Sequence, residues 1–173
     1  MGRIDTSEAG GLVGRDHQLE QLSDALTAGH CRAVAVGGVG GIGKSTLVAS
    51  FCVYARSVGA SVVRIDGRDI EPTPQGVLGA LASAAGTDDA TIDGVVTRLE
   101  SLADRVVLVV ENYERLRLAD RFIRDEFGPA VSSSVLLVLV GRDQLVMPWF
   151  TDPGWVGQVR TIELGALDED GSL

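Results

Sequence analysis

The sequence predicts an α/β fold in which helices cover both faces of a five-stranded, mainly parallel sheet. Two features of the chain lead to this prediction. Short apolar runs alternate with helical patterns along the chain, and the runs themselves are almost continuously apolar. A strand that is buried on both faces has this composition, whereas a half-exposed strand alternates apolar and polar residues.

The predicted elements follow one another with a helix after almost every strand. The first helix is expected to begin at Asp16, a good capping residue, because leucines recur after it at spacings of three and four. Gly29 and Gly59 stand where the first two helical patterns end, as glycine commonly does. Strands are expected at 33–36, 61–66, 105–110, 135–140 and 158–164, and helices at 16–28, 45–57, 77–85, 92–103 and 118–127.

Charge and composition limit the classes of partner. The formal net charge of −9 argues against nucleic acid or an anionic membrane as a partner of this domain. The longest wholly apolar run, 135–140, is far shorter than the roughly 18 residues of a membrane-spanning helix. Cys31 and Cys52 lie among apolar residues without metal-ligand spacing, so we expect buried thiols and a cytoplasmic protein.

One basic residue differs from all the others. Of the 15 basic residues, only Lys44 is a lysine, and the remainder are arginines. A chain that otherwise uses arginine keeps a lysine where a compact ammonium group does what a planar guanidinium group cannot. Lys44 is therefore the first candidate for a chemical role.

Lys44 lies in a phosphate-binding motif. Residues 38–45 match the pattern G-x-x-x-x-G-K-[ST] in full, between a predicted strand and a predicted helix. In this pattern the lysine reaches the β- and γ-phosphates and the Ser45 hydroxyl binds Mg²⁺. Glycines let backbone N–H groups curl around the phosphates. The expected phosphate-binding residues are Gly38, Gly40, Gly41, Ile42, Gly43, Lys44, Ser45 and Thr46.

Carboxylates follow the third predicted strand. Glu111 ends that strand and Glu114 comes three residues later. A P-loop enzyme needs a carboxylate near the end of a neighbouring strand to hold the metal and to orient the attacking water. We therefore expect Glu111 as a metal ligand and Glu114 as the catalytic base. The alternative is a solvated acidic loop without function.

Arg142 follows the fourth predicted strand and is the expected sensor of the γ-phosphate. The alternative is an arginine that pairs with Asp143 or with a helix carbonyl. Three aromatic residues lie close together further along, at Trp149, Phe150 and Trp155. Packing within their turn, or against absent domains, explains them better than a platform for base stacking.

These residues resemble a known class. Residues 12–19, LVGRDHQL, are similar to the entry motif of the STAND ATPases, the signal-transduction class that includes NB-ARC and NACHT proteins. Residues 40–47, GGIGKSTL, are similar to its phosphate loop. The segments ENYE at 111–114, VGR at 140–142 and DPGW at 152–155 resemble the corresponding motifs of actinobacterial ATPase modules of this kind.

The resemblance implies a three-layer P-loop fold of the ASCE or AAA+ type, in which a sensor strand separates the Walker B strand from the P-loop strand. It also implies ATP or ADP with Mg²⁺, and adenine held near Val13, Gly14 and Arg15. The implied organisation is a lead-in at 1–11, the ATPase domain at 12–165, and at 166–173 the start of a link to lid, winged-helix and effector domains. A nucleotide-dependent oligomer is compatible with it. The chain departs from the family pattern at Glu111, where the Walker B residue is usually an aspartate. The longer side chain places its carboxylate differently relative to Mg²⁺, which argues against fast hydrolysis.

Three functions follow from these residues. The leading one is a nucleotide-binding switch domain of a larger bacterial regulator, with slow or partner-dependent ATP hydrolysis. The alternatives are a small-molecule phosphotransferase, for which Asp66 is the candidate acceptor-binding residue, and an interaction module that binds nucleotide without hydrolysing it. A GTPase is disfavoured, because the guanine-reading N-K-x-D motif needs a second lysine.

Overall fold

A computed structural model describes residues 16–38 and 43–165 of the chain. Its centre is one sheet of five strands in the order β2-β3-β4-β1-β5, and every neighbouring pair is parallel. The strands are β1 (Ala33–Gly37), β2 (Ser61–Asp66), β3 (Val106–Glu111), β4 (Val135–Gly141) and β5 (Val159–Glu163). The predicted α/β class and five-stranded parallel sheet are confirmed, and each strand lies within one residue of its predicted bounds.

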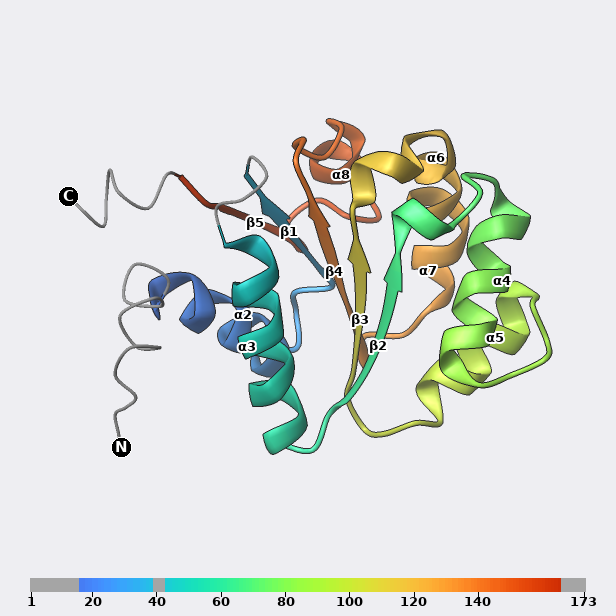
Figure 1. Ribbon diagram of the computed structural model, residues 1–173, viewed down its shortest axis with the longest axis horizontal. Coiled ribbons are helices and arrows are strands. Elements are labelled where there is room, and N and C mark those ends of the chain that lie inside the picture. The colour runs from blue at the N-terminus through green and yellow to red at the C-terminus, as the bar shows by residue number, and fades with distance from the viewer. Residues whose placement is uncertain (1–15, 39–42, 166–173) are drawn as a thin grey trace.

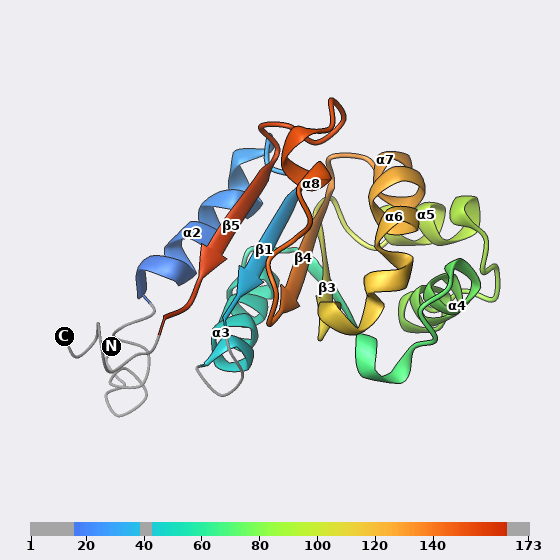
Figure 2. The same ribbon diagram turned by 90° about the horizontal axis from the view of Figure 1, so that it is seen from above.

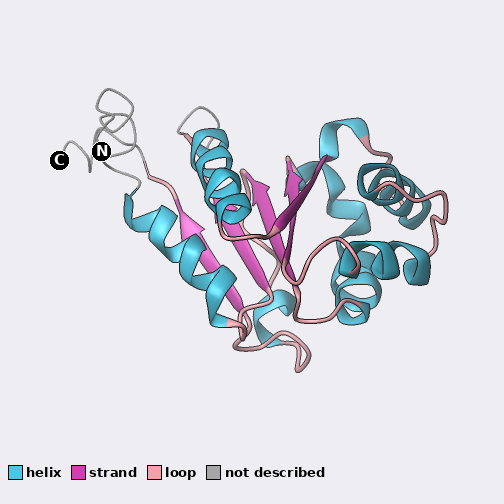
Figure 3. Ribbon diagram, turned by 90° about the horizontal axis from the view of Figure 1, so that it is seen from below, coloured by secondary structure: helices cyan, strands magenta, loops and turns pink. Residues whose placement is uncertain are grey.

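Helices cover both faces of the sheet and make three layers (Figures 1 and 2). Seen from below, two long helices flank one face and a group of shorter ones flanks the other (Figure 3). The first layer holds α2 (Asp16–Ala28) and α3 (Lys44–Ser57). The other helical segments are η2 (Gly67–Asp69), α4 (Pro74–Ala85), α5 (Ile92–Glu100), η3 (Tyr113–Ala119), α6 (Asp120–Phe122), η4 (Ile123–Phe127), α7 (Gly128–Ala130) and α8 (Pro148–Thr151).

The apolar runs form the central strands because both of their faces are buried. Every residue of β1 and β4 is buried, and only the last residue of β3 is partly exposed. One core, which includes Val34, Phe51 and Val138, fills the space between the sheet and α2 and α3. The other core includes Leu108 and Trp149 and lies on the opposite face. Both free cysteines are buried, as expected.

Threonine caps fix the two helices that follow β2. The Thr73 hydroxyl accepts a hydrogen bond from the Gly76 N–H at the start of α4, and Thr91 accepts one from Gly94 at the start of α5. Each bond satisfies an N–H group that has no partner within the helix. None of the helices in the described part of the chain is long and apolar enough to cross a bilayer.

The prediction of a single helix over 118–127 is wrong. The chain instead passes from a 3₁₀ segment (η3) through one α turn (α6) into a π-helical turn (η4). In η4 the Gly128 N–H bonds to the carbonyl of Ile123, five residues back, while the Arg124 carbonyl accepts from Trp155 Nε1 at 2.8 Å. A tertiary contact with Trp155 therefore takes the carbonyl that a regular α-helix would use.

Candidate functional site

The site forms where the carboxyl ends of three strands meet the start of α3. Gly37 ends β1, Glu111 ends β3 and Gly141 ends β4, and parallel strands place these ends on the same edge of the sheet. Strand β4 lies between β1 and β3. The sheet order implied by the resemblance is therefore confirmed, and ligands bind at this edge in open α/β sheets.

The described ends of the glycine loop have the backbone that such a loop needs. Gly38 has φ 145° and Gly43 has φ 95°, both in the region that favours glycine. The predicted loop residues Gly40, Gly41 and Ile42, and the predicted adenine-site residues Val13, Gly14 and Arg15, lie outside the described residues.

Helix α3 begins at Lys44 and has no acidic residue in its first turn. A lysine at a helix N-terminus is unfavourable on its own, because the helix dipole places partial positive charge there. The same arrangement becomes favourable when an anion binds, since the first-turn N–H groups and the ammonium group then act together.

Lys44 lies among charged groups of the site. Its Nζ donates a hydrogen bond to the Gly38 carbonyl, across the loop. Burial lowers the pKa of Lys44, and the nearby Arg142 lowers it further, while Glu114 and Glu163 act in the opposite direction. Lys44 therefore interacts electrostatically with charged residues in the segments that follow β3 and β4 and in β5.

A cleft of about 330 Å³ joins the predicted residues. Its lining residues are Gly43, Lys44, Ser45, Thr46, Glu111, Asn112, Glu114, Val140, Gly141 and Arg142. Ser45 and Thr46 are exposed on the first turn of α3, so their hydroxyl groups are accessible from the cleft. Every predicted catalytic, phosphate-contacting or metal-binding residue within the described part of the chain lines this cleft, except Gly38.

Glu111 has a partner that the sequence did not predict. Both Nε and Nη2 of Arg64, on β2, donate to Glu111 Oε2, at 3.0 and 2.6 Å. The side chains are 37% and 23% exposed, so the pair is partly open to solvent, and only Glu111 lines the cleft. Hydrogen bonding to Glu111 raises the pKa of Arg64 above its ordinary value. An arginine thus holds the carboxylate that was expected to bind the metal.

Glu114 is tied to the end of β4. The backbone N–H of Arg142 donates to Glu114 Oε1 at 3.1 Å. Gly141 allows this approach, because a Cβ there would lie 3.0 Å from the same oxygen. Asp143 forms its ion pair with Arg117, at 3.3 Å, and not with Arg142. The alternative interpretation, in which Arg142 pairs with Asp143, is therefore not what the structure shows.

The end of β2 is joined to the same edge through Asn112. Asn112 has a left-handed backbone, with φ 54°, and its side-chain amide donates to Asp66 Oδ1 at 2.8 Å. Asp66 also accepts from Arg68, which lowers its pKa below the ordinary value. A carboxylate with these partners and a lowered pKa is a poor base for activating a phosphate acceptor.

The aromatic residues pack within the domain. Trp149 and Trp155 are fully or almost fully buried, and their ring centroids lie 4.7 Å apart. Trp149 Nε1 donates to Asp120 Oδ1 at 2.8 Å. The packing interpretation is confirmed for these two residues, and they offer no exposed face for base stacking.

The donor set of the cleft fits Mg²⁺. The described residues contain no group of three or more His, Cys, Asp or Glu side chains that could hold a metal ion by themselves. Ser45 and Glu111, however, offer two hard oxygen ligands, and Mg²⁺ in phosphate sites usually takes one or two protein oxygens together with phosphate oxygens and water. A phosphate ligand is therefore needed to complete such a site.

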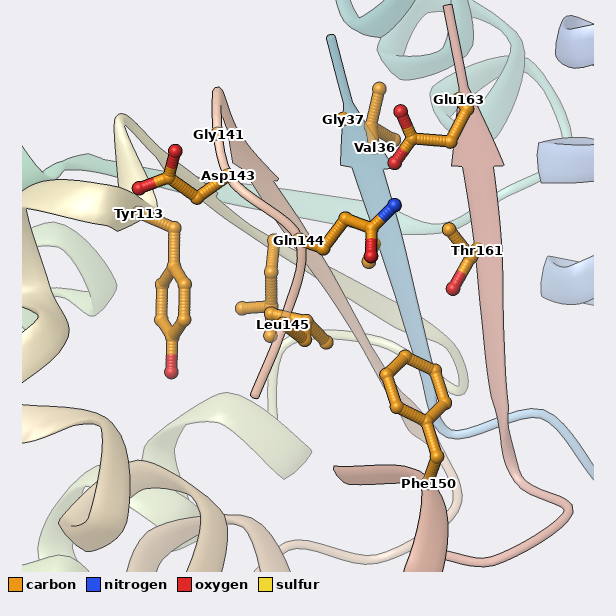
Figure 4. A pocket seen from close by; sticks show the side chains of 12 residues that line it. Val36, Gly37, Tyr113, Gly141, Asp143, Gln144, Leu145, Phe150, Thr161 and Glu163 are labelled. Atoms are coloured by element: carbon orange, nitrogen blue, oxygen red, sulfur yellow. The ribbon is translucent and has the colours of Figure 1, made fainter. Parts of the chain in front are cut away.

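A second hollow lies beside the cleft. It has a volume of about 100 Å³, and Figure 4 shows Tyr113, Gln144, Phe150 and Glu163 around it. Pockets for drug-sized ligands measure about 300–1,000 Å³, so this hollow is too small for a nucleotide. The larger cleft at α3 is the better candidate.

A comparison with models of protein families identifies the family to which the chain belongs. The family model described as "AAA ATPase domain" matches residues 11–140. The chain belongs to the AAA ATPase domain family. This AAA ATPase domain thus has the P-loop AAA+ fold that its motifs predicted. A search of curated protein sequences gave no match.

Solved structures share the fold of this AAA ATPase domain. The Orc1 protein of Aeropyrum pernix, in complex with DNA, is 18% identical with a TM-score of 0.58, over 91% of this chain and 49% of that one. Cdc6p of Pyrobaculum aerophilum is 20% identical with a TM-score of 0.57, over 87% and 45%. A chain of Drosophila ORC bound to DNA is 13% identical with a TM-score of 0.57, over 94% and 49%. The domain spans about half the length of these proteins.

These neighbours correct one expectation. The net charge of −9 predicts that nucleic acid is not a partner of this domain, yet the same fold occurs in proteins solved in complex with DNA. Net charge averages the whole surface, whereas phosphate contacts depend on where a few basic groups lie. The exclusion is therefore wrong.

Proposed function

We propose that this AAA ATPase domain is a nucleotide-dependent switch of the STAND class, which binds ATP or ADP with Mg²⁺ and hydrolyses ATP slowly or only with a partner. The observation that carries the proposal is the cleft of about 330 Å³ that brings Lys44, Ser45, Glu114 and Arg142 together. These residues come from three separate segments of the chain. Their convergence is what phosphoryl-transfer chemistry requires, because that chemistry depends on positioning and charge.

Each residue has a role in this proposal. Lys44 leaves the Gly38 carbonyl and contacts the β- and γ-phosphates, while the first-turn N–H groups of α3 bind phosphate oxygens. Ser45 and Glu111 hold Mg²⁺, which neutralises phosphate charge when it is bound. Glu114 orients and deprotonates the attacking water, and Arg142 contacts the γ-phosphate. Adenine lies near Val13, Gly14 and Arg15.

Two contacts support slow hydrolysis. Arg64 occupies Glu111 Oε2 at 2.6 Å, so the metal must compete with a guanidinium group for that carboxylate. Glu114 Oε1 accepts a hydrogen bond from the Arg142 backbone, so one oxygen of the proposed base is already occupied. Both contacts have to loosen before the two carboxylates can act fully.

The wider role is part of the same proposal. As in the STAND ATPases that residues 12–19 and 40–47 resemble, a lid and an effector domain in a larger bacterial regulator would complete it. The nucleotide state would then control the effector, with or without formation of an oligomer. A cytoplasmic location fits this role.

Single-turnover hydrolysis of ATP tests the catalytic part. We expect slow phosphate release from the unaltered protein and loss of that release in Glu114→Gln, with nucleotide affinity kept within about threefold, since a general base contributes about 10²–10⁴-fold to rate. No release from the unaltered protein, with or without candidate partners, would favour the module that binds nucleotide without hydrolysis. ADP formation that depends on a small-molecule acceptor would favour a phosphotransferase.

A further inference from the structure

A buried carboxylate lines a small hollow that shares Glu114 with the cleft. It is not one of the residues given a role in the proposed function. Asp120, at the start of α6, is only 7% exposed. Its Oδ1 accepts hydrogen bonds from the Tyr113 hydroxyl at 2.5 Å and from Trp149 Nε1 at 2.8 Å. Its Oδ2 accepts one from Arg124, which is 8% exposed. Three donors from three segments thus converge on one side chain.

Two of these donors belong to the segments that carry the proposed catalytic residues. Tyr113 is the first residue of η3 and directly precedes Glu114. Trp149 lies in α8, at the end of the segment that begins with Arg142 after β4. Asp120 therefore links the two segments through its buried hydrogen bonds to Tyr113 and Trp149. The hydrogen bond from the Arg142 N–H to Glu114 links the same segments at the cleft.

The two segments touch at further points between these ends. Arg117 and Asp143 form an exposed ion pair at 3.3 Å. A hollow of about 30 Å³ separates the segments, and Tyr113, Glu114, Asp120 and Asp143 are among its lining residues. An exposed ion pair contributes little to holding such a geometry, so the buried contacts at Asp120 are the stronger link.

The bonds to Asp120 are stable because the carboxylate is buried. A buried charge without partners is strongly unfavourable, whereas a fully hydrogen-bonded one fixes the geometry of its donors. Burial, together with the Asp120 charge, raises the pKa of Tyr113 well above its ordinary value of 10.0, so the hydroxyl remains a donor into the alkaline range. The Tyr113 ring and the Trp149 ring are thus held in fixed positions relative to each other.

We propose that Asp120 is a positioning residue, which through Tyr113 and Trp149 holds Glu114 and Arg142 as one unit and makes that unit respond to the γ-phosphate. This inference rests on the proposed function. When Arg142 moves toward a γ-phosphate, the segment that it begins moves with it, and Trp149 changes its environment. ADP lacks the γ-phosphate and leaves the unit as it is.

The tryptophans supply a direct readout. The chain has only two, Trp149 and Trp155, and their rings are in contact. We expect the fluorescence of the protein to differ between the complexes with a non-hydrolysable ATP analogue and with ADP. Tyr113→Phe removes one hydroxyl and keeps the ring, so it breaks the link to η3 without emptying the core. Tyr54→Phe removes the hydroxyl of the only other tyrosine, on α3, and is the matched control.

The expected result separates positioning from folding and binding. Tyr113→Phe should reduce the difference between the two fluorescence spectra to less than about half, and should lower kcat about tenfold with KM within about twofold, as a misplaced catalytic group does. Tyr54→Phe should behave like the unaltered protein in both respects. Calorimetry on each variant confirms that nucleotide still binds, and circular dichroism confirms that it folds.

Three results would overturn the inference. Equal spectral differences and equal kcat in Tyr113→Phe and in the unaltered protein would show that Asp120 does not act on the cleft. No spectral difference in the unaltered protein, with nucleotide bound by calorimetry, would overturn the inference and leave the proposed function standing. No nucleotide binding by the unaltered protein would overturn both. If hydrolysis is too slow to measure, the spectral difference alone decides.

Discussion

The backbone N–H of Arg142 donates a hydrogen bond to Glu114 Oε1 at 3.1 Å, so the residue proposed to sense the γ-phosphate directly contacts the residue proposed to activate water. The contact uses the main chain of Arg142 and leaves its exposed guanidinium group available to the cleft. The two contributions of Arg142 can therefore be separated by mutation.

Arg142→Ala should weaken the preference for ATP over ADP and leave Glu114 in place. The guanidinium group is the part that reaches the γ-phosphate, and a charge-assisted contact of this kind contributes about 1.5–3 kcal/mol. We expect the affinity for a non-hydrolysable ATP analogue to fall about tenfold or more, and ADP affinity to stay within about twofold. Calorimetric titration with both nucleotides measures this.

Arg56→Ala is the control for that experiment. Arg56 is exposed in the last turn of α3, at the opposite end of the helix from the cleft. The Arg56→Ala variant should bind both nucleotides with the affinities of the unaltered protein. An equal loss of ATP and ADP affinity in Arg142→Ala would indicate a general electrostatic effect and contradict the sensor role.

Arg64→Leu should alter the dependence of nucleotide binding on Mg²⁺. The variant frees the Glu111 carboxylate from its guanidinium partner, so less Mg²⁺ should be needed for half-maximal binding. The pair is partly exposed, and such pairs contribute about 0–1 kcal/mol, so the free energy of unfolding should change by no more than that. Titration of Mg²⁺ at fixed ATP checks the first point and urea unfolding checks the second. A Mg²⁺ requirement that does not change would argue against Glu111 as a ligand.

Gly67→Ala should destabilise the domain, whereas Gly79→Ala should not. A Cβ on Gly67 would lie 2.5 Å from the Asn112 carbonyl oxygen, a backbone atom that cannot move without disturbing the end of β3. Overpacking of this kind costs about 1–3 kcal/mol. A Cβ on Gly79, inside α4, would meet no atom within 4 Å, and alanine there should add about 0.5–1 kcal/mol. Urea unfolding of both variants measures the difference, and equal stabilities would contradict the observed approach.

Alkaline pH should unfold the protein partly through Tyr113. Burial raises the pKa of Tyr113 well above 10.0, so above that pH the unfolded chain loses a proton that the folded chain retains. Its contribution to stability is therefore complete below pH 10 and declines as the pH rises toward the folded pKa. In Tyr54→Phe the remaining tyrosine is Tyr113, and its ultraviolet absorbance should show ionisation only together with unfolding. Ionisation near pH 10 in the folded protein would contradict this.

The positions of the strands were predictable because they depend on local pattern. Fully buried parallel strands need continuous apolar residues, and 135–140 and 105–110 contain almost nothing else. The segment 118–127 was not predictable in the same way. Its helical periodicity is real, but the Arg124 carbonyl bonds to Trp155, which lies 31 residues further along, and a local pattern cannot contain that contact.

The cleft divides similarly into predictable and unpredictable parts. Lys44, Ser45, Glu111, Glu114 and Arg142 could be proposed because each follows a strand or begins a helix with a motif around it. The partner of Glu111 could not, since Arg64 lies on another strand and only the pairing of β2 with β3 brings it near.

Calorimetric titration of MgATP into the unaltered protein and into Lys44→Ala tests the central claim most directly. Lys44 is the cation that this site provides at the start of α3, and its removal should abolish measurable binding. Lys44→Arg should also bind poorly, because a planar guanidinium group does not replace a compact ammonium group in a tight glycine loop. Saturable binding to the unaltered protein that is lost in Lys44→Ala is the predicted result. Unchanged affinity in Lys44→Ala would contradict the assignment of this cleft as the nucleotide site.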